Sequence, residues 1–174
     1  MIGEDIGVEN YIPPEDVHGV IANPVCTQFS TANYHNPRNM SQALFLVKHC
    51  LRIIESSNPK WWVLENPATG KLKDFLGKAN NTYQPYEYGS PYTKRTALWG
   101  NFKMPKSIFN WTNVPKNPNL YARPNRKPSL AFLHKSSIKF MPEFEWCKEK
   151  IKTDADLRSL CSYGFACAFK ESNP

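Results

Sequence analysis

A cysteine and a glutamate that each follow an apolar run are the residues of this chain with the clearest chemical potential. Cys26 comes shortly after the run "HGVIANP", and Glu65 comes directly after Trp61–Leu64. A thiolate can add to an electron-poor carbon, and a carboxyl group can hold or donate a proton. An isolated cysteine is also a common small apolar core residue, so an inert buried thiol is the alternative interpretation.

The residues around this pair predict a strand, a helix and a second strand. The run "HGVIANP" predicts a short buried strand that ends at Pro24, and Trp61–Leu64 predicts another strand that ends at Asn66-Pro67. Between them, leucine, valine and isoleucine recur at helical spacing and predict an amphipathic helix over roughly Ser41–Ser56. Parallel strands joined in this way place their functional residues at one sheet edge, so the thiol and the carboxyl group would meet there.

The remainder of the chain contains fewer regular elements. Residues 103–142 are rich in proline and basic residues and predict an irregular segment. The other elements that we expect are a short helix around Leu72–Leu76, strands over Tyr83–Tyr88 and "ALWGNF", a helix that begins at Asp154 or Asp156, and a last helix within "SYGFACAFKES".

The charge of the chain favours a polyanionic partner. The formal net charge is +7, and from Asn101 to Phe140 there are eight basic residues and no acidic one. Aromatic residues are interleaved with these cations, which favours nucleic acid over a simple solvated loop. The basic residues that we predict to contact nucleic acid are Lys103, Lys106, Arg123, Arg126 and Lys127.

Several classes of protein are disfavoured by composition. The five cysteines are odd in number and form no Cys-x-x-Cys pair, so we expect neither a disulfide framework nor a metal site. No apolar stretch approaches the ~20 residues that span a bilayer, and the first 20 residues do not resemble a signal peptide. We therefore expect no membrane partner and a cytoplasmic location.

Three segments together resemble the DNA (cytosine-5) methyltransferases. "NPVCTQFS" is similar to the cysteine loop of that family, "LENP" to its Glu-Asn-Val strand end, and "YGSPYTKR" to its Tyr-Gly-x-Pro-Gln-x-Arg-x-Arg segment. The small phage-encoded members are the most similar, and their last helix resembles "LRSLCSYGFACAFKESNP". The resemblance implies a Rossmann-like α/β fold, with a mostly parallel sheet and flanking helices. It also implies that the protein acts in a bacterial or phage-infected cell.

The resemblance also implies roles for individual residues. Cys26 would add as a thiolate to carbon 6 of cytosine, so that carbon 5 can accept a methyl group. Glu65 would stabilise a proton on ring nitrogen 3, a role that requires burial to weaken its acidity. Asn66 would orient the loop or the base. Lys94 and Arg95 would contact the extruded base and its phosphate.

The methyl donor implied by the resemblance is S-adenosylmethionine, and the other partner is DNA. The residues that match the positions beside the donor are Asp5, Ile6, Asn23 and Pro24. Gln28 and Ser30 match positions on the DNA side of the cysteine loop.

The chain also departs from the family pattern. Val25 stands where the family has proline, and Tyr92 and Thr96 replace a glutamine and an arginine of the basic segment. The glycines do not cluster into the loop that holds the methionine end of the donor. We therefore expect an N-terminally truncated domain whose uncovered sheet edge favours self-association or a partner chain.

The resulting prediction has three segments and two functional alternatives. Residues 1–102 would be the methyltransferase core, residues 103–149 a basic insertion for target recognition, and residues 150–174 helices that return to the core. The first alternative is a DNA modification enzyme that methylates carbon 5 of cytosine. The second is a catalytically inactive remnant that binds nucleic acid.

Overall fold

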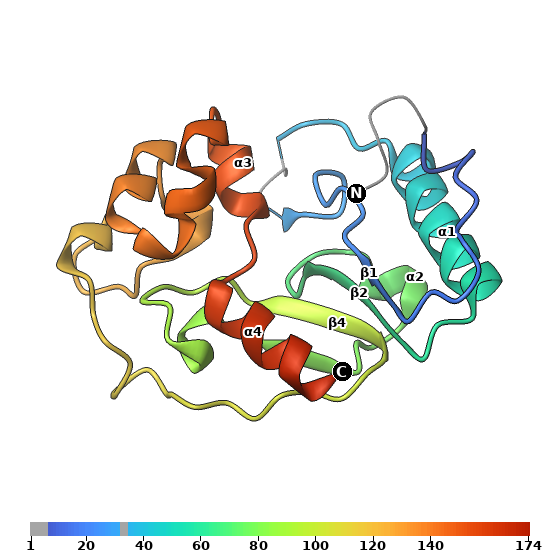
Figure 1. The fold of residues 1–174 in the computed structure, drawn as a ribbon. Helices are drawn as coiled ribbons and strands as arrows, with labels where there is room; N and C mark the ends of the chain where they lie inside the picture. Colours follow the sequence, from blue (N-terminus) through green and yellow to red (C-terminus); the bar gives the residue numbers. More distant parts are fainter. Residues whose placement is uncertain (1–6, 32–34) are drawn as a thin grey trace. The chain divides into compact units, whose positions relative to one another are not determined.

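The computed structural model describes residues 7–31 and 35–174 (Figure 1). The chain divides into two compact units. The first unit comprises Met1–Thr82 and Thr96–Phe102, and the second comprises Tyr83–Arg95 and Lys103–Pro174. Asp5 and Ile6, two of the predicted cofactor residues, lie outside the described residues. The units are described separately below.

The predicted strand, helix and strand of the first unit are confirmed. β1 (Gly19–Ala22) and β2 (Trp61–Pro67) are parallel neighbours, with Ala22 paired with Leu64, and α1 (Met40–Ser57) connects them. The side chain of Asn39 caps α1 by accepting a hydrogen bond from the backbone of Gln42 at 3.0 Å. The parallel register brings the carboxyl ends of both strands to one sheet edge, as predicted.

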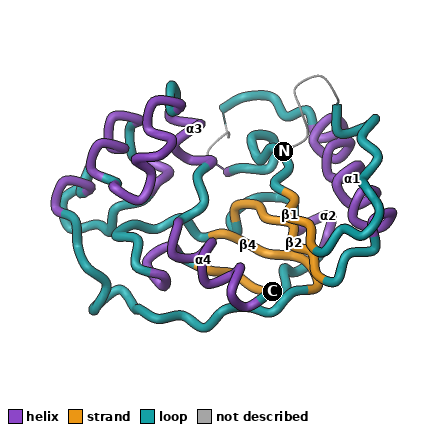
Figure 2. The backbone as a smooth tube through the Cα atoms, viewed as in Figure 1, coloured by secondary structure: helices purple, strands orange, loops and turns teal. Residues whose placement is uncertain are grey.

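The sheet is mixed rather than mostly parallel, which corrects the prediction. Its strand order is β1-β2-β4-β3, with β3 at Asn81–Tyr83 and β4 at Thr96–Asn101, and β4 runs antiparallel to β2. Figure 2 shows β1, β2 and β4 side by side. A parallel return to the neighbouring position needs a crossover, usually a long helix. The segment between β2 and β4 contains only the single turn of α2 (Lys73–Leu76), β3 and a 3-10 helix, so the chain returns in the opposite direction.

Two predicted strands have different bounds in the structure. β2 continues through Pro67, because its last three residues pair with the first three of β4. The predicted strand over Tyr83–Tyr88 is wrong: β3 ends at Tyr83, and a 3-10 helix occupies Pro85–Tyr88. Pro85 fixes the first helical position, and Gln84 and Glu87 form a reciprocal capping box that stabilises the helix start.

One face of α1 packs on the sheet and on the cysteine loop to form the core of the first unit. Leu64 and Phe29 are fully buried there, so the strand and the loop that carry the candidate residues share one apolar cluster. The buried members of this cluster are Ala22, Phe29, Ala43, Val47, Ile54, Leu64, Leu72, Ala97 and Trp99.

The second unit is built from short turns around its own core. Residues 103–142 contain short 3-10 helices at Pro118–Leu120, Leu130–Phe132 and Lys135–Phe140, and a further one covers Pro142–Lys150. The core around them includes Tyr92, Leu120, Leu130, Leu133, Ile138, Met141, Phe144, Cys147 and Leu157. The segment predicted to be irregular is therefore compact.

Both predicted C-terminal helices form within the second unit. α3 (Asp154–Ser159) starts at a capping box between Thr153 and Asp156, whose carboxylate accepts backbone hydrogen bonds that lower its pKa. α4 (Tyr163–Ser172) stacks Phe165 on Tyr83, with ring centroids 3.6 Å apart. In residues 7–31 and 35–174, no helix is both long and apolar enough to cross a bilayer.

The packing between β2 and β4 predicts a large difference between two glycine substitutions. Gly100 has a φ of 146°, and a Cβ atom there would lie 2.1 Å from the Trp62 carbonyl oxygen, whereas Gly77, with a φ of 75°, faces open space. We expect Gly77→Ala to cost about 1–3 kcal/mol of backbone strain. Gly100→Ala should cost more than Gly77→Ala, because it adds a clash with the Trp62 backbone. Urea unfolding of both variants measures the difference, and equal losses of stability would contradict the described β2–β4 approach.

Candidate active site at the ends of β1 and β2

Cys26 lies on a tight turn that follows β1. The backbone N–H groups of Phe29 and Ser30 both donate to the Cys26 carbonyl, at 3.0 and 2.8 Å. The Phe29 ring is buried in the core, and its carbonyl accepts a hydrogen bond from the backbone of Lys71 at 2.9 Å. The thiol side chain itself is half-buried, so the turn holds it in place without closing it off from solvent.

Asn66 connects this loop to the end of β2. Its side chain is 1% exposed, and Nδ2 donates to the Pro24 carbonyl at 3.1 Å. The residue next to Glu65 is therefore bonded to a residue two positions before Cys26. Oδ1 of Asn66 has no hydrogen-bond partner among the described residues, which leaves one buried acceptor at this strand end.

Arg38 secures the other side of the turn, a role that no pattern in the sequence predicts. One guanidinium nitrogen of Arg38 donates to the Gln28 carbonyl, and the other donates to the Ser30 carbonyl at 2.9 Å. The Gln28 side-chain oxygen accepts from the backbone of Asn39 at 2.9 Å. Gln28 and Ser30, the two loop residues predicted to face DNA, are therefore also the residues that hydrogen-bond to the segment just before α1.

Glu65 lies on β2 between Leu64 and Asn66, and strand alternation places its side chain on the opposite face of the sheet from theirs. Leu64 is part of the core with α1, so strand alternation places the half-buried Glu65 side chain on the face away from that helix. Within residues 7–31 and 35–174, its carboxylate forms no hydrogen bond or ion pair. The structure therefore brings Cys26, Asn66 and Glu65 to one edge of one sheet, with the carboxylate available to a ligand.

Lys94 and Arg95 belong to the second unit. The ammonium group of Lys94 donates to the Leu160 carbonyl at 3.0 Å, and its backbone N–H donates to the side chain of Gln84 at 3.1 Å. Arg95 is exposed and directly precedes β4. Of the two predicted cations, Arg95 is the better placed to bind a solvent-borne anion.

The predicted basic residues Lys103, Lys106, Arg123, Arg126 and Lys127 are all exposed. Arg123 covers the Phe132 ring at 3.6 Å from its centroid. Lys127 lies 4.9 Å from the centroid of Trp111, which also holds Lys116 at 3.9 Å. Cations and rings are therefore neighbours on this surface, an arrangement suited to both phosphates and bases.

Asn23 and Pro24 are the two predicted cofactor residues that the structure describes. Asn23 is exposed, Pro24 is buried, and the Pro24 carbonyl accepts the Asn66 hydrogen bond. The glycines of the sequence lie on separate segments, and none follows β1 or β2 directly. Among the described residues there is also no group of three or more His, Cys, Asp or Glu side chains that could hold a metal ion.

Comparison with known proteins finds no protein-family model and no curated protein that matches this chain.

The buried hydrogen bond between Asn66 and Pro24 can be tested by removing its donor. We expect Asn66→Ala to lower the free energy of unfolding by about 1–3 kcal/mol, because the Pro24 carbonyl is left without a partner inside the protein. Thr69→Ala, at an exposed position just after the same strand, is the control and should change stability by less than about 0.5 kcal/mol. Chemical denaturation compares the variants, and similar small effects would show that the hydrogen bond contributes little.

Proposed function

We propose that this chain is a DNA (cytosine-5) methyltransferase-like protein in which Cys26 adds covalently to cytosine. The observation that carries the proposal is the junction of the cysteine turn with the end of β2, where Asn66 bonds to Pro24 and Glu65 is adjacent. The sequence resemblance assigns a nucleophile and a carboxyl group to these positions. Their shared sheet edge supports that assignment.

The reaction begins with addition of the Cys26 thiolate to carbon 6 of the base. A carbon–sulfur bond forms, the 5,6 double bond opens, and its electron pair makes carbon 5 nucleophilic. Carbon 5 can then take a proton from water, or a methyl group where a donor is bound. Loss of the hydrogen originally on carbon 5 and expulsion of the thiolate restore the aromatic base.

Glu65 donates the proton that offsets the negative charge formed on the ring in this addition. A carboxyl group that donates to ring nitrogen 3 stabilises the charge that builds up on the ring as sulfur attacks. The base cannot reach such a site while it is stacked in a duplex, so the substrate base is extruded.

The methyl donor of this proposal is S-adenosylmethionine, by resemblance alone. The steps above use only the side chains of this chain. Addition of the thiolate to cytosine and transfer of a methyl group can therefore be tested in separate experiments.

Exchange of the carbon 5 hydrogen tests the addition step without a methyl donor. Duplex DNA that carries tritium at carbon 5 of cytosine should release tritium into water when incubated with the protein. Cys26→Ser should lower the release rate by at least about 100-fold, and Glu65→Gln by about 10–100-fold, because general acid catalysis is removed.

The matched control for the thiol is Cys161→Ser, since Cys161 is an exposed cysteine of the second unit. This variant should retain the release rate of the original protein. Two results would contradict the proposed nucleophile. One is tritium release that persists in the Cys26→Ser variant, and the other is no tritium release from DNA that the original protein binds.

A second candidate function is nucleic-acid binding without chemistry. The exposed cation and aromatic pairs of the second unit favour it, because they require no intact catalytic centre. The exchange experiment separates the two candidates, since a binding remnant holds DNA but releases no tritium.

The salt dependence of DNA affinity tests the basic surface in either case. A triple variant, Lys103→Gln, Lys106→Gln and Arg126→Gln, should flatten the plot of log affinity against log salt by about 0.9 for each phosphate that the variant no longer neutralises. Fluorescence anisotropy with a labelled duplex gives the slopes. The control triple variant is Lys48→Gln, Lys71→Gln and Lys73→Gln, which are exposed residues of the first unit and should leave the slope unchanged.

A further inference from the structure

The first unit contains a pocket of about 400 Å³ that the proposed chemistry of Cys26 does not use. It reaches β2 at Trp62, near the start of the strand, whereas Glu65 and Asn66 lie near its end. The lining residues come from α1, β2, β4 and the segment that leads from α2 to β3, and they are Leu51, Trp62, Leu76, Lys78, Asn80, Trp99 and Gly100. A volume of this size accommodates a small organic molecule.

The walls of this pocket are apolar. Leu51, Trp62 and Leu76 are half-buried, and all three pack against the core of the first unit. Trp99 is buried, and its indole N–H already donates to the Gly77 carbonyl at 3.0 Å, so it offers only ring surface. A ligand that fills the pocket therefore needs an apolar body, whose removal from water stabilises the complex.

The two polar side chains of the lining present hydrogen-bond donors. Oδ1 of Asn80 accepts a hydrogen bond from the backbone N–H of Gly100 at 2.9 Å, which leaves Nδ2 to donate to a ligand. The ammonium group of Lys78 forms no hydrogen bond or ion pair with the described residues. No Asp or Glu is among the described residues that line the pocket. Two donors, one of them charged, favour a ligand group that carries acceptors and a negative charge.

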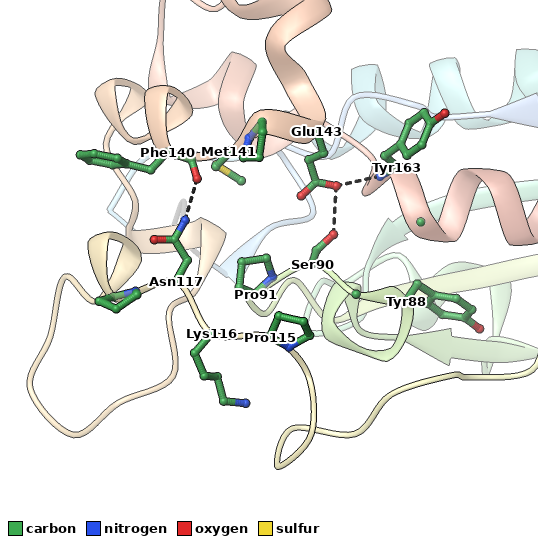
Figure 3. A pocket seen from close by; sticks show the side chains of 14 residues that line it. Tyr88, Ser90, Pro91, Pro115, Lys116, Asn117, Phe140, Met141, Glu143 and Tyr163 are labelled. Carbon is green, nitrogen blue, oxygen red and sulfur yellow. Dashed lines mark hydrogen bonds between the residues drawn. The ribbon is translucent and has the colours of Figure 1, made fainter.

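A pocket of the second unit shows the opposite arrangement (Figure 3). There Glu143 accepts hydrogen bonds from the Ser90 hydroxyl and from the backbone N–H of Tyr163, both at 3.0 Å. The side chain of Asn117 donates to the Phe140 carbonyl at 2.7 Å. These polar groups hold segments of the second unit together, whereas Lys78 and Nδ2 of Asn80 remain open to a ligand.

We propose that the pocket of the first unit binds a small carboxylate with an apolar body. The carboxylate accepts a hydrogen bond from Nδ2 of Asn80 and pairs with the Lys78 ammonium group, while the body lies against Trp62 and the two leucines. One ammonium group offsets one negative charge, so a carboxylate fits better than a phosphate group, which carries nearly two charges at neutral pH. The proposal holds whether or not Cys26 reacts with cytosine.

Calorimetry with the full chain tests the proposal on probes of matched shape. The aromatic series is indole-3-acetate, indole-3-acetamide and tryptamine, and the aliphatic pair is hexanoate and hexanamide. We expect at least one acid to bind at least about fivefold more tightly than its amide, because a charge-assisted hydrogen bond is stronger than a neutral one. Tryptamine should bind more weakly than indole-3-acetamide, because its ammonium group is repelled by Lys78.

Two substitutions test whether the acid binds in this pocket. Asn80→Asp keeps an oxygen for the Gly100 N–H but replaces the donor with a negative charge, so it should weaken acid binding about tenfold or more. Lys78→Gln should weaken acid binding about threefold or more, since an exposed ion pair contributes modestly. The matched control is Lys73→Gln, which changes an exposed lysine outside the lining and should bind the acid like the original chain.

Three results would overturn the proposal. They are the absence of binding by both acids, equal affinity for each acid and its amide, and unchanged acid binding by an Asn80→Asp variant that retains its thermal unfolding transition.

Discussion

The proposed site depends on one buried contact, the hydrogen bond from Asn66 to the Pro24 carbonyl. It joins the end of β2 to the loop after β1, two segments that are distant in sequence but adjacent because their strands are parallel. Arg38 holds the far side of the same turn through the Gln28 and Ser30 carbonyls. A nucleophile on a loop fixed at both sides gives up little entropy when it meets its target atom, which is how a protein accelerates addition.

The two units differ in charge as well as in structure. The first unit has 7 basic and 8 acidic residues, whereas the excess of positive charge is confined to the second unit. Covalent chemistry at cytosine and attraction of a polyanion can therefore be assigned to different parts of the chain. This division agrees with the proposal that the first unit carries the reaction and the second carries contacts to nucleic acid.

Local patterns in the sequence were enough to predict the central strand, helix and strand. Apolar spacing located α1, and short apolar runs that end in proline located β1 and β2. Their positions after apolar runs identified Cys26 and Glu65 as candidates, and the resemblance added Asn66. The structure places these three residues at one edge of the sheet.

What the sequence could not predict depends on contacts between distant residues. The antiparallel direction of β4 follows from how the chain returns after β2, and the capping box at Pro85 replaced an expected strand because Gln84 and Glu87 bond to each other's backbone. Arg38 carries no local pattern that marks it as the anchor of a loop.

The central claim is that the Cys26 sulfur adds to carbon 6 of a pyrimidine in DNA. The most direct test uses an oligonucleotide duplex in which 2-pyrimidinone replaces cytosine, since its more electrophilic carbon 6 lets the adduct accumulate. Intact mass spectrometry should detect a species with the summed mass of protein and DNA strand, and peptide mapping should place the bond on Cys26. An adduct on another cysteine, or no adduct with duplex that the protein demonstrably binds, would contradict the account.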